Sequence, residues 1–266
     1  MDKAVDSHIK SFYNSSDLYF NICQIRDEAS FSNILAVINQ YVPKNGSLLE
    51  FGCGTGNLAN LVAKNEYNVF GVDISEKFIA YAQETYGVED QSLKFQVVGF
   101  GPLPFDDNRF DCIYTCAVLE HCYEVDKIVQ DLHRLLKPGG FLIIATPNIL
   151  SPFTRFSFLI KRLTGERKRF HLYGSPTFFF KSIWYCATKA LSSKADLMYV
   201  TPNYESFSES DEDVTFLSNH FDYLKILKPL NYKILELSRG TSKGGKIIAK
   251  LFPKLSGEVL IVAKKR

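Results

Sequence analysis

The stretch LLEFGCGTGN, residues 48–57, limits the possible folds most strongly, because three glycines stand on alternate positions directly after an apolar run. Glycine weakens the interior of a strand or helix, so Gly52, Gly54 and Gly56 predict a sharp turn or a backbone that something approaches closely. Apolar runs alternate with helical patterns around this turn, and strands are expected at SLLEF, NVFGVD, LKFQVV, DCIYTC and FLIIATPN. The alternation predicts an α/β fold with a doubly wound, mostly parallel sheet that binds its ligand beyond the carboxyl ends of the strands.

The spacing of the glycines narrows the choice of ligand. A dinucleotide fingerprint reads G-x-G-x-x-G, but this chain has Asn57 where the third glycine belongs, and no G-x-x-x-x-G-K-[ST] phosphate loop occurs. The pattern is instead E-x-G-x-G-x-G from Glu50, and Asp73 ends the next apolar run. An acidic group at that position can accept hydrogen bonds from two ribose hydroxyls of a ligand, while the glycine backbone leaves room for a zwitterionic tail of the same ligand.

Four segments in order resemble the motifs of class I S-adenosylmethionine-dependent methyltransferases: LLEFGCGTG, VDIS, LPFDDNRFDCIYTCAVLEH and LHRLLKPGGFLIIATPN. The resemblance is dense over residues 45–150, looser beyond, and points to the small-molecule type found among ubiquinone, menaquinone and sugar methyltransferases. It implies a Rossmann-like sheet of seven strands with the last strand antiparallel, and the residues after the fifth strand predict a helical, aromatic insert that is not common to the family. It also implies S-adenosylmethionine as the cofactor.

The resemblance assigns roles at the cofactor. Glu50 would anchor the turn and organise contacts to the methionyl amine, and Asp73 would bind the ribose diol. Family members often carry Asp where this chain has Gly99, so adenine is expected to rest on apolar packing instead. The alternatives are a plain turn requirement for the glycines and a helix-end carboxylate for Asp73. The residues expected at the cofactor are Glu50, Gly52, Cys53, Gly54, Gly56, Asp73, Ile74, Phe100 and Thr115.

The segment TCAVLEHC would face the methyl group in this family, which makes His121 a candidate general base. A histidine that serves the core or a helix cap is the competing interpretation. Glu120 and His121 are similar to the Glu-His pair of ubiquinone-pathway O-methyltransferases, some of which hold a metal with a further Glu three residues earlier. Ala117 stands at that position here, so no metal is expected.

The insert is expected to select the acceptor. Residues 148–218 are rich in aromatics and carry the basic run RLTGERKRFH. Such residues could line a pocket for a phosphate-, sugar- or lipid-linked acceptor, rest on a membrane surface, or form a helical cap with solvated cations. His171 is a second catalytic candidate, and Glu120, Arg169 and Tyr173 are expected to contact substrate.

The chain divides into four expected parts: an N-terminal helical lid at 1–40, in which Tyr13, Tyr19 and Phe20 could close over the cofactor; a cofactor-binding core at 41–150; the substrate-side insert at 151–218; and a completion of the sheet at 219–266. The acidic stretch YESFSESDEDV is expected to be a solvated loop. KIIAKLFPKL could form an amphipathic surface element, although its short length argues against a membrane role.

Charge and composition limit the partners. Residues 1–147 hold 11 Lys and Arg against 19 Asp and Glu, while residues 148–266 hold 20 against 10, which would suit an anionic substrate or surface. No Pro-Pro-Tyr type motif is present, so no nucleic-acid substrate is expected. No apolar run approaches the roughly 20 residues of a membrane span, and neither a signal peptide nor a Cys-x-x-Cys pair is present. A cytoplasmic protein is therefore expected, as a monomer or homodimer. Peripheral contact with a membrane is left open.

The function predicted from these patterns is methyl transfer from S-adenosylmethionine to a hydroxyl or amine of a small molecule. The alternative is a non-catalytic relative that binds the cofactor or a protein partner.

Overall fold

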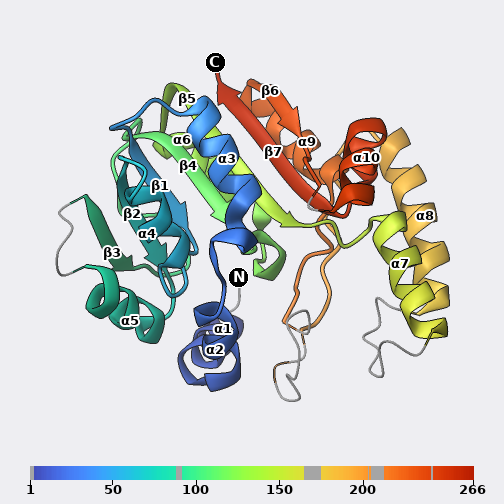
Figure 1. Cartoon of the computed structure of the whole chain (residues 1–266), viewed down its shortest axis with the longest axis horizontal. Coiled ribbons are helices and arrows are strands. Elements are labelled where there is room, and N and C mark those ends of the chain that lie inside the picture. Colours follow the sequence, from blue (N-terminus) through green and yellow to red (C-terminus); the bar gives the residue numbers. More distant parts are fainter. Residues whose placement is uncertain (1–2, 88–91, 165–174, 203, 205–212, 241) are drawn as a thin grey trace.

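A seven-stranded sheet forms the centre of the computed structural model (Figure 1), which describes residues 3–266 except 88–91, 165–174, 203, 205–212 and 241. The strand order is β3-β2-β1-β4-β5-β7-β6. The strands are β1 (Ser47–Phe51), β2 (Asn68–Asp73), β3 (Leu93–Val97), β4 (Phe110–Cys116), β5 (Leu136–Pro147), β6 (Tyr232–Leu237) and β7 (Glu258–Lys265).

Strand directions confirm the predicted fold class. β7 is antiparallel to both of its neighbours, β5 and β6, whereas every other pairing is parallel. The chain leaves β1 toward β2 on one side, while β4 pairs with β1 on the other side. The order of the strands therefore reverses at β1, and a crevice opens at the carboxyl ends of β1 and β4.

Helices cover both faces of the sheet because successive strand residues point to opposite sides. Leu48 of β1 belongs to one buried cluster and Leu49 to the other. The Leu48 cluster is covered by α3 (Ser32–Tyr41), α4 (Asn57–Ala63) and α5 (Glu76–Tyr86), and the Leu49 cluster by α6 (Val125–Leu135) and α9 (His220–Leu227). Ser75 caps α5 as expected, since its side chain accepts a hydrogen bond from the backbone N–H of Phe78.

Two short helices precede this core, α1 (Lys3–Ser15) and α2 (Asp17–Gln24), followed by a 3-10 turn at Glu28–Phe31. They lie below the carboxyl ends of the parallel strands in Figure 1, next to α5. Ile9, Phe12 and Tyr13 pack against Phe78 of α5 in a small buried cluster. The N-terminal helices therefore lie over the crevice, where the expected lid would be.

The insert after β5 forms the helices α7 (Pro152–Leu163) and α8 (Pro176–Leu191), at the opposite end of the molecule from β3 (Figure 1). Ile149, Leu150, Phe178 and Cys186 bury a small core of their own there. The connection from β6 to β7 contains α10 (Lys243–Leu251) and a 3-10 turn at Pro253–Leu255, beside α7 and α8 in Figure 1. Further 3-10 turns lie at Leu119–His121 and Lys228–Leu230.

Within the part of the chain that the structure describes, no helix has both the length and the apolar character needed to cross a membrane. The cytoplasmic location expected from the sequence stays a prediction.

Candidate active site

The glycine turn after β1 combines two glycines required by packing with one that faces open space. All three have left-handed backbone, with φ of 76° at Gly52, 52° at Gly54 and 82° at Gly56. A Cβ at Gly52 would lie 2.4 Å from a methyl of Val118, and one at Gly56 would lie 2.8 Å from the ring of Phe95. A Cβ at Gly54 would meet nothing within 4 Å. Gly54 is thus the place where a ligand can approach the turn.

Asp73 holds this turn in place from the end of β2. Its Oδ2 accepts a hydrogen bond of 2.9 Å from the Gly54 N–H, and its Oδ1 accepts one of 2.9 Å from the Ser75 N–H. Burial raises the pKa of the Asp73 carboxyl, and these backbone donors act against that shift. A carboxylate can accept about four hydrogen bonds, so Asp73 retains capacity for further donors such as hydroxyls.

Glu50 ends the buried part of β1 and is almost fully enclosed. The hydroxyl of Tyr114, from the neighbouring strand β4, donates to Glu50 Oε2 at 3.3 Å. Desolvation raises the pKa of Glu50 well above its usual range, although the Tyr114 hydrogen bond opposes this. Such a buried carboxyl is suited to receive a cationic group of a ligand, because that charge would favour the ionised form.

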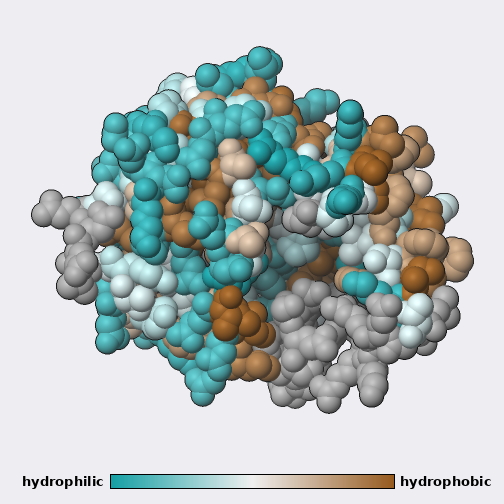
Figure 2. Space-filling view, in the orientation of Figure 1, coloured by the Kyte–Doolittle hydropathy of each residue, from teal (hydrophilic) through white to brown (hydrophobic). Residues whose placement is uncertain are grey.

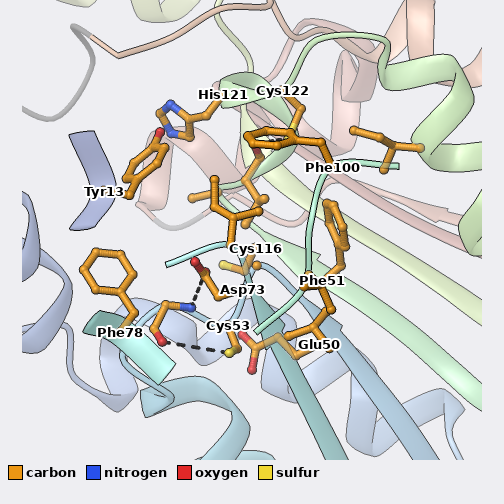
Figure 3. A pocket seen from close by; sticks show the side chains of 18 of the residues that line it. Tyr13, Glu50, Phe51, Cys53, Asp73, Phe78, Phe100, Cys116, His121 and Cys122 are labelled. Atoms are coloured by element: carbon orange, nitrogen blue, oxygen red, sulfur yellow. Dashed lines mark hydrogen bonds between the residues drawn. The ribbon is translucent and has the colours of Figure 1, made fainter. Parts of the chain in front are cut away.

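A cavity of about 460 Å³ extends from the glycine turn to the loop after β4 (Figure 3). Glu50 and Cys53 lie at one end in Figure 3, and His121 and Tyr13 lie together at the other. The expected cofactor residues that line it are Glu50, Gly52, Cys53, Gly54, Asp73, Ile74 and Phe100. Gly56 and Thr115 do not line it. Gly56 packs against Phe95, and Thr115 is buried within β4.

The loop after β3 supplies the remaining wall. Val98, Gly99, Phe100 and Leu103 line the cavity, and a Cβ at Gly99 would meet nothing within 4 Å. This part of the cavity offers apolar side chains where family members often carry Asp.

His121 belongs to a buried polar group that joins three distant parts of the chain. Its Nδ1 lies 3.2 Å from Asp213 Oδ2, and the hydroxyl of Tyr13 in α1 donates to the same carboxylate oxygen at 3.0 Å. Asp213 is fully buried. The carboxylate fixes the ring of His121 and favours a proton on Nδ1, so the lone pair of a neutral imidazole remains on Nε2.

Glu120 does not line the cavity. It is buried beside β5, where the Thr146 hydroxyl donates to its Oε2 at 2.5 Å. Its Oε1 lies 3.7 Å from His121 Nε2, and burial raises its pKa while His121 opposes the shift. Glu120 therefore lies beside His121 Nε2 but outside the cavity lining, so its expected contact with substrate stays a prediction without support from the cavity. His171, Arg169 and Tyr173 lie outside the described residues.

The expectation that the whole acidic stretch is a solvated loop is wrong at its end. Asp213 is buried because the apolar run that follows it, residues 214–217, enters the core and pairs with the loop after β4: the Thr215 and Phe216 N–H groups both donate to the Glu120 carbonyl. In the sequence, this apolar run was the feature that could have predicted the burial of Asp213.

Asn57, like Asp213, has a role at the site that the sequence patterns did not predict. Its side-chain amide donates to the carbonyls of Cys23, Gln24 and Arg26, at 3.3, 3.1 and 3.0 Å. A residue that follows the glycine turn therefore holds the end of α2 over the cavity.

No group of three His, Cys, Asp or Glu side chains that could hold a metal ion occurs in the described ranges of the chain. The absence of a metal in this protein stays a prediction.

Comparison with known proteins agrees with this geometry. Residues 49–144 match a family model described as a methyltransferase domain. A sterol 24-C-methyltransferase of Gibberella zeae is 30% identical over 149 residues, covering 49% of this chain and 39% of the relative. A ubiquinone biosynthesis O-methyltransferase of Coxiella burnetii is 33% identical over 115 residues, covering 43% of this chain and 49% of the relative. The chain thus spans half or less of the length of these relatives.

Among solved structures, a putative S-adenosylmethionine-dependent methyltransferase from Listeria monocytogenes aligns with a TM-score of 0.58 at 12% identity, covering 88% of this chain and 99% of that one. At such low identity this likeness concerns the fold. Residues 49–144 therefore form a methyltransferase domain, and the sheet around them has the fold of S-adenosylmethionine-dependent methyltransferases.

Proposed function

We propose that this protein transfers a methyl group from S-adenosylmethionine to a hydroxyl or amine of a small molecule. The observation that supports this most strongly is one continuous cavity that joins the open face of Gly54 and the carboxylate of Asp73 to His121. A cavity of about 460 Å³ lies within the range of roughly 300–1,000 Å³ typical of small-molecule sites.

The residues at the glycine turn fit the cofactor. Glu50 would receive the cationic methionyl amine, since its carboxyl is buried, lines the cavity and accepts from the neutral Tyr114 hydroxyl. Asp73 would accept the ribose hydroxyls with the lone pairs that Gly54 and Ser75 leave free. Adenine would rest on the apolar wall after β3, where the missing carboxylate at Gly99 costs about 1 kcal/mol of polar anchoring.

When bound, S-adenosylmethionine supplies a methyl group on a positively charged sulfur, which departs as a neutral thioether. His121 would take the proton of the acceptor hydroxyl or ammonium at Nε2, and Asp213 would stabilise the resulting imidazolium. Tyr13 donates to the same Asp213 oxygen that lies next to His121 Nδ1 and so keeps this carboxylate oriented toward the ring. Asp213 and Tyr13 are thus positioning residues, and His121 is the catalytic residue.

The lid side chains contribute by excluding water. Tyr13, Tyr19 and Phe31 line the cavity from the N-terminal segment. The Tyr19 ring lies edge-on to His121, with centroids 6.5 Å apart. A closed, largely apolar enclosure keeps nucleophile and methyl group aligned and excludes competing water.

The relatives support a small-molecule acceptor, because two of them are named for sterol and ubiquinone biosynthesis. We propose a sugar-, phosphate- or lipid-linked acceptor for this chain. A non-catalytic protein that binds the cofactor is the second candidate, since cofactor contacts alone do not require the His121–Asp213 pair.

The test is the formation of S-adenosylhomocysteine from S-adenosylmethionine when fractions of small metabolites are added. We expect product with at least one fraction, and a decrease of about a hundred-fold in His121→Asn, which corresponds to one general base. Cofactor binding by His121→Asn should stay unchanged. Tight cofactor binding without turnover in any fraction would favour the non-catalytic candidate.

A further inference from the structure

The helix α8 carries large apolar side chains both toward the core and toward solvent. Phe178 and Cys186 are buried inward. On the outer side, Phe180 is 68% exposed, Trp184 is 67% exposed and Leu191 is 89% exposed. Their spacing of four and seven residues places them along one stripe of the helix. A helix in water normally carries polar residues on such a stripe, so this one is adapted to another neighbour.

The stripe continues onto α7 and α10. Exposed apolar side chains there are Phe153, Phe156 and Ile160 of α7, Ile247 and Leu251 of α10, and Phe252 after it. The rings of Phe153 and Phe252 lie 5.9 Å apart, as do those of Phe156 and Phe179. Figure 2 shows hydrophobic residues gathered on the right of the molecule, where Figure 1 places α7, α8 and α10. We name the exposed apolar residues of these helices and Phe252 the α7–α8–α10 face.

A shallow groove runs through this face. Its volume is about 530 Å³, and Ile183 of α8 and Phe252 lie on its walls together with Lys254. The groove and the exposed residues around it form a broad apolar surface, and surfaces of this kind mark contact sites for proteins or membranes.

The charge of the face distinguishes between these two kinds of partner. The helices α7, α8 and α10 contain no Asp or Glu. Exposed lysines accompany the apolar residues, namely Lys161, Lys181, Lys243, Lys246, Lys250 and Lys254. In a symmetric dimer through this face, lysines would meet lysines. An anionic lipid surface would accept the lysines at its headgroups and the aromatic side chains just below them.

We propose that the α7–α8–α10 face docks the protein on the surface of an anionic membrane. The helix α10 alone is too short to dock on a membrane, as expected from the sequence, but α7 and α8 extend the same surface. Docking of this kind requires no spanning segment and no catalytic turnover, so the proposal stands independently of methyl transfer.

Trp184 provides the test, because it is the single tryptophan of the chain and lies within the face. Its fluorescence is followed while the full chain is titrated with vesicles of phosphatidylcholine alone, or of phosphatidylcholine and phosphatidylglycerol in equal parts. We expect the emission to move to shorter wavelength with the anionic vesicles, the protein to float with them, and added salt to reverse both effects.

Charge reversal separates this docking from non-specific adsorption. Lys246→Glu combined with Lys250→Glu should weaken binding to the anionic vesicles at least ten-fold. The matched control, Lys64→Glu combined with Lys233→Glu, changes the net charge equally at exposed sites outside the face and should bind like the unchanged chain.

Three results would overturn the proposal. They are an unchanged Trp184 emission with both kinds of vesicle, equal binding to both kinds with no effect of the Lys246 and Lys250 substitutions, and an emission shift that follows protein concentration without lipid. The last result would mean that a second copy of the chain covers the face.

Discussion

Among single residues, the three alternate glycines of the first turn serve different neighbours. Gly52 and Gly56 lack a side chain because Val118 and Phe95 occupy the space where a Cβ would stand. Gly54 has open space, so packing does not require its missing side chain. Under the proposed function, this one motif combines two glycines that packing requires with one that leaves room for the cofactor.

Substitution by alanine separates the two requirements. Gly54→Ala should lower the free energy of unfolding by only about 1 kcal/mol, the cost of left-handed backbone for a residue with a Cβ. Gly56→Ala adds a clash with Phe95 and should cost about 3 kcal/mol. Urea unfolding measures both. Equal destabilisation by the two substitutions would contradict the assignment of Gly54 to the ligand.

Glu50 makes stability depend on pH. Because burial raises its pKa in the folded state, the folded protein binds its proton more readily than the unfolded chain does. The stability associated with this proton is present below the unfolded pKa, about 4.3, and is lost as pH rises through the raised folded pKa. Glu50→Gln keeps an acceptor for the Tyr114 hydroxyl and removes the buried charge.

We therefore expect Glu50→Gln, without cofactor, to be at least as stable as the unchanged chain near about pH 7, and to lose that advantage toward about pH 4. Urea midpoints across this range measure the effect. An advantage that grows as pH falls would show that the folded state prefers the ionised Glu50.

Between elements, the N-terminal helices are attached to the core by one apolar cluster and by polar contacts at their ends. Asn57 donates to three carbonyls at the end of α2, and Asn14 Oδ1 of α1 accepts from the Ser75 hydroxyl at 3.0 Å. Tyr13 adds its hydrogen bond to Asp213. Attachment by a few hydrogen bonds and one small apolar cluster is compatible with opening to admit ligands.

Asn57→Ala tests this attachment. It removes the donors to the end of α2, so we expect backbone hydrogen exchange in residues 10–25 to accelerate roughly ten-fold, which corresponds to about 1.4 kcal/mol. Cofactor should slow exchange in the same residues. Asn65→Ala is the matched control, because its amide donates to Leu61 within the core. Unchanged exchange in Asn57→Ala would mean that other contacts hold the lid.

Short-range patterns in the sequence predicted most strands and helices of the core. Strands such as β2 and β4 are short apolar runs bounded by turns, and α5 begins at a recognisable cap, Ser75. The segment that forms α10 was expected only as a possible amphipathic surface element. Gly244 and Gly245 disfavour a helix in its first turn, and Ser242, which caps the backbone of Gly245, compensates for them.

Across the protein, short sequence patterns could not predict which distant residues the tertiary fold brings into contact. Tyr13 and Asp213 are 200 positions apart and meet only because α1 and the segment before α9 both reach the crevice. The motifs predicted Asp73 and His121 at the site because each follows directly on a strand or its loop. Asp213, the partner of His121, lies in an acidic stretch whose composition predicted exposure to solvent.

The insert is joined to the core by a buried ion pair. Lys189 Nζ of α8 lies 2.6 Å from Asp222 Oδ2 of α9, and both side chains are almost fully enclosed. The Asn219 amide and the Asp196 N–H also donate to this carboxylate. Such a pair fixes the position of α8 relative to the sheet, because neither charge can remain buried alone.

Lys189→Met should therefore lower the free energy of unfolding by about 3–5 kcal/mol, since it leaves the Asp222 charge without its cation. Lys181→Met on the exposed side of the same helix should change it by less than about 0.5 kcal/mol. Thermal and urea unfolding give the comparison. A loss below about 1 kcal/mol in Lys189→Met would show that the neutral donors alone satisfy Asp222.

Binding of S-adenosylmethionine and S-adenosylhomocysteine decides whether the cavity is a methyltransferase site. Calorimetric titration should give micromolar binding to the unchanged chain and to Glu84→Ala, a carboxylate exposed on α5. Asp73→Ala should weaken binding ten-fold or more, about 1.4 kcal/mol. No heat with either ligand in the unchanged chain, or undiminished binding by Asp73→Ala, would contradict the assignment of this cavity to the cofactor.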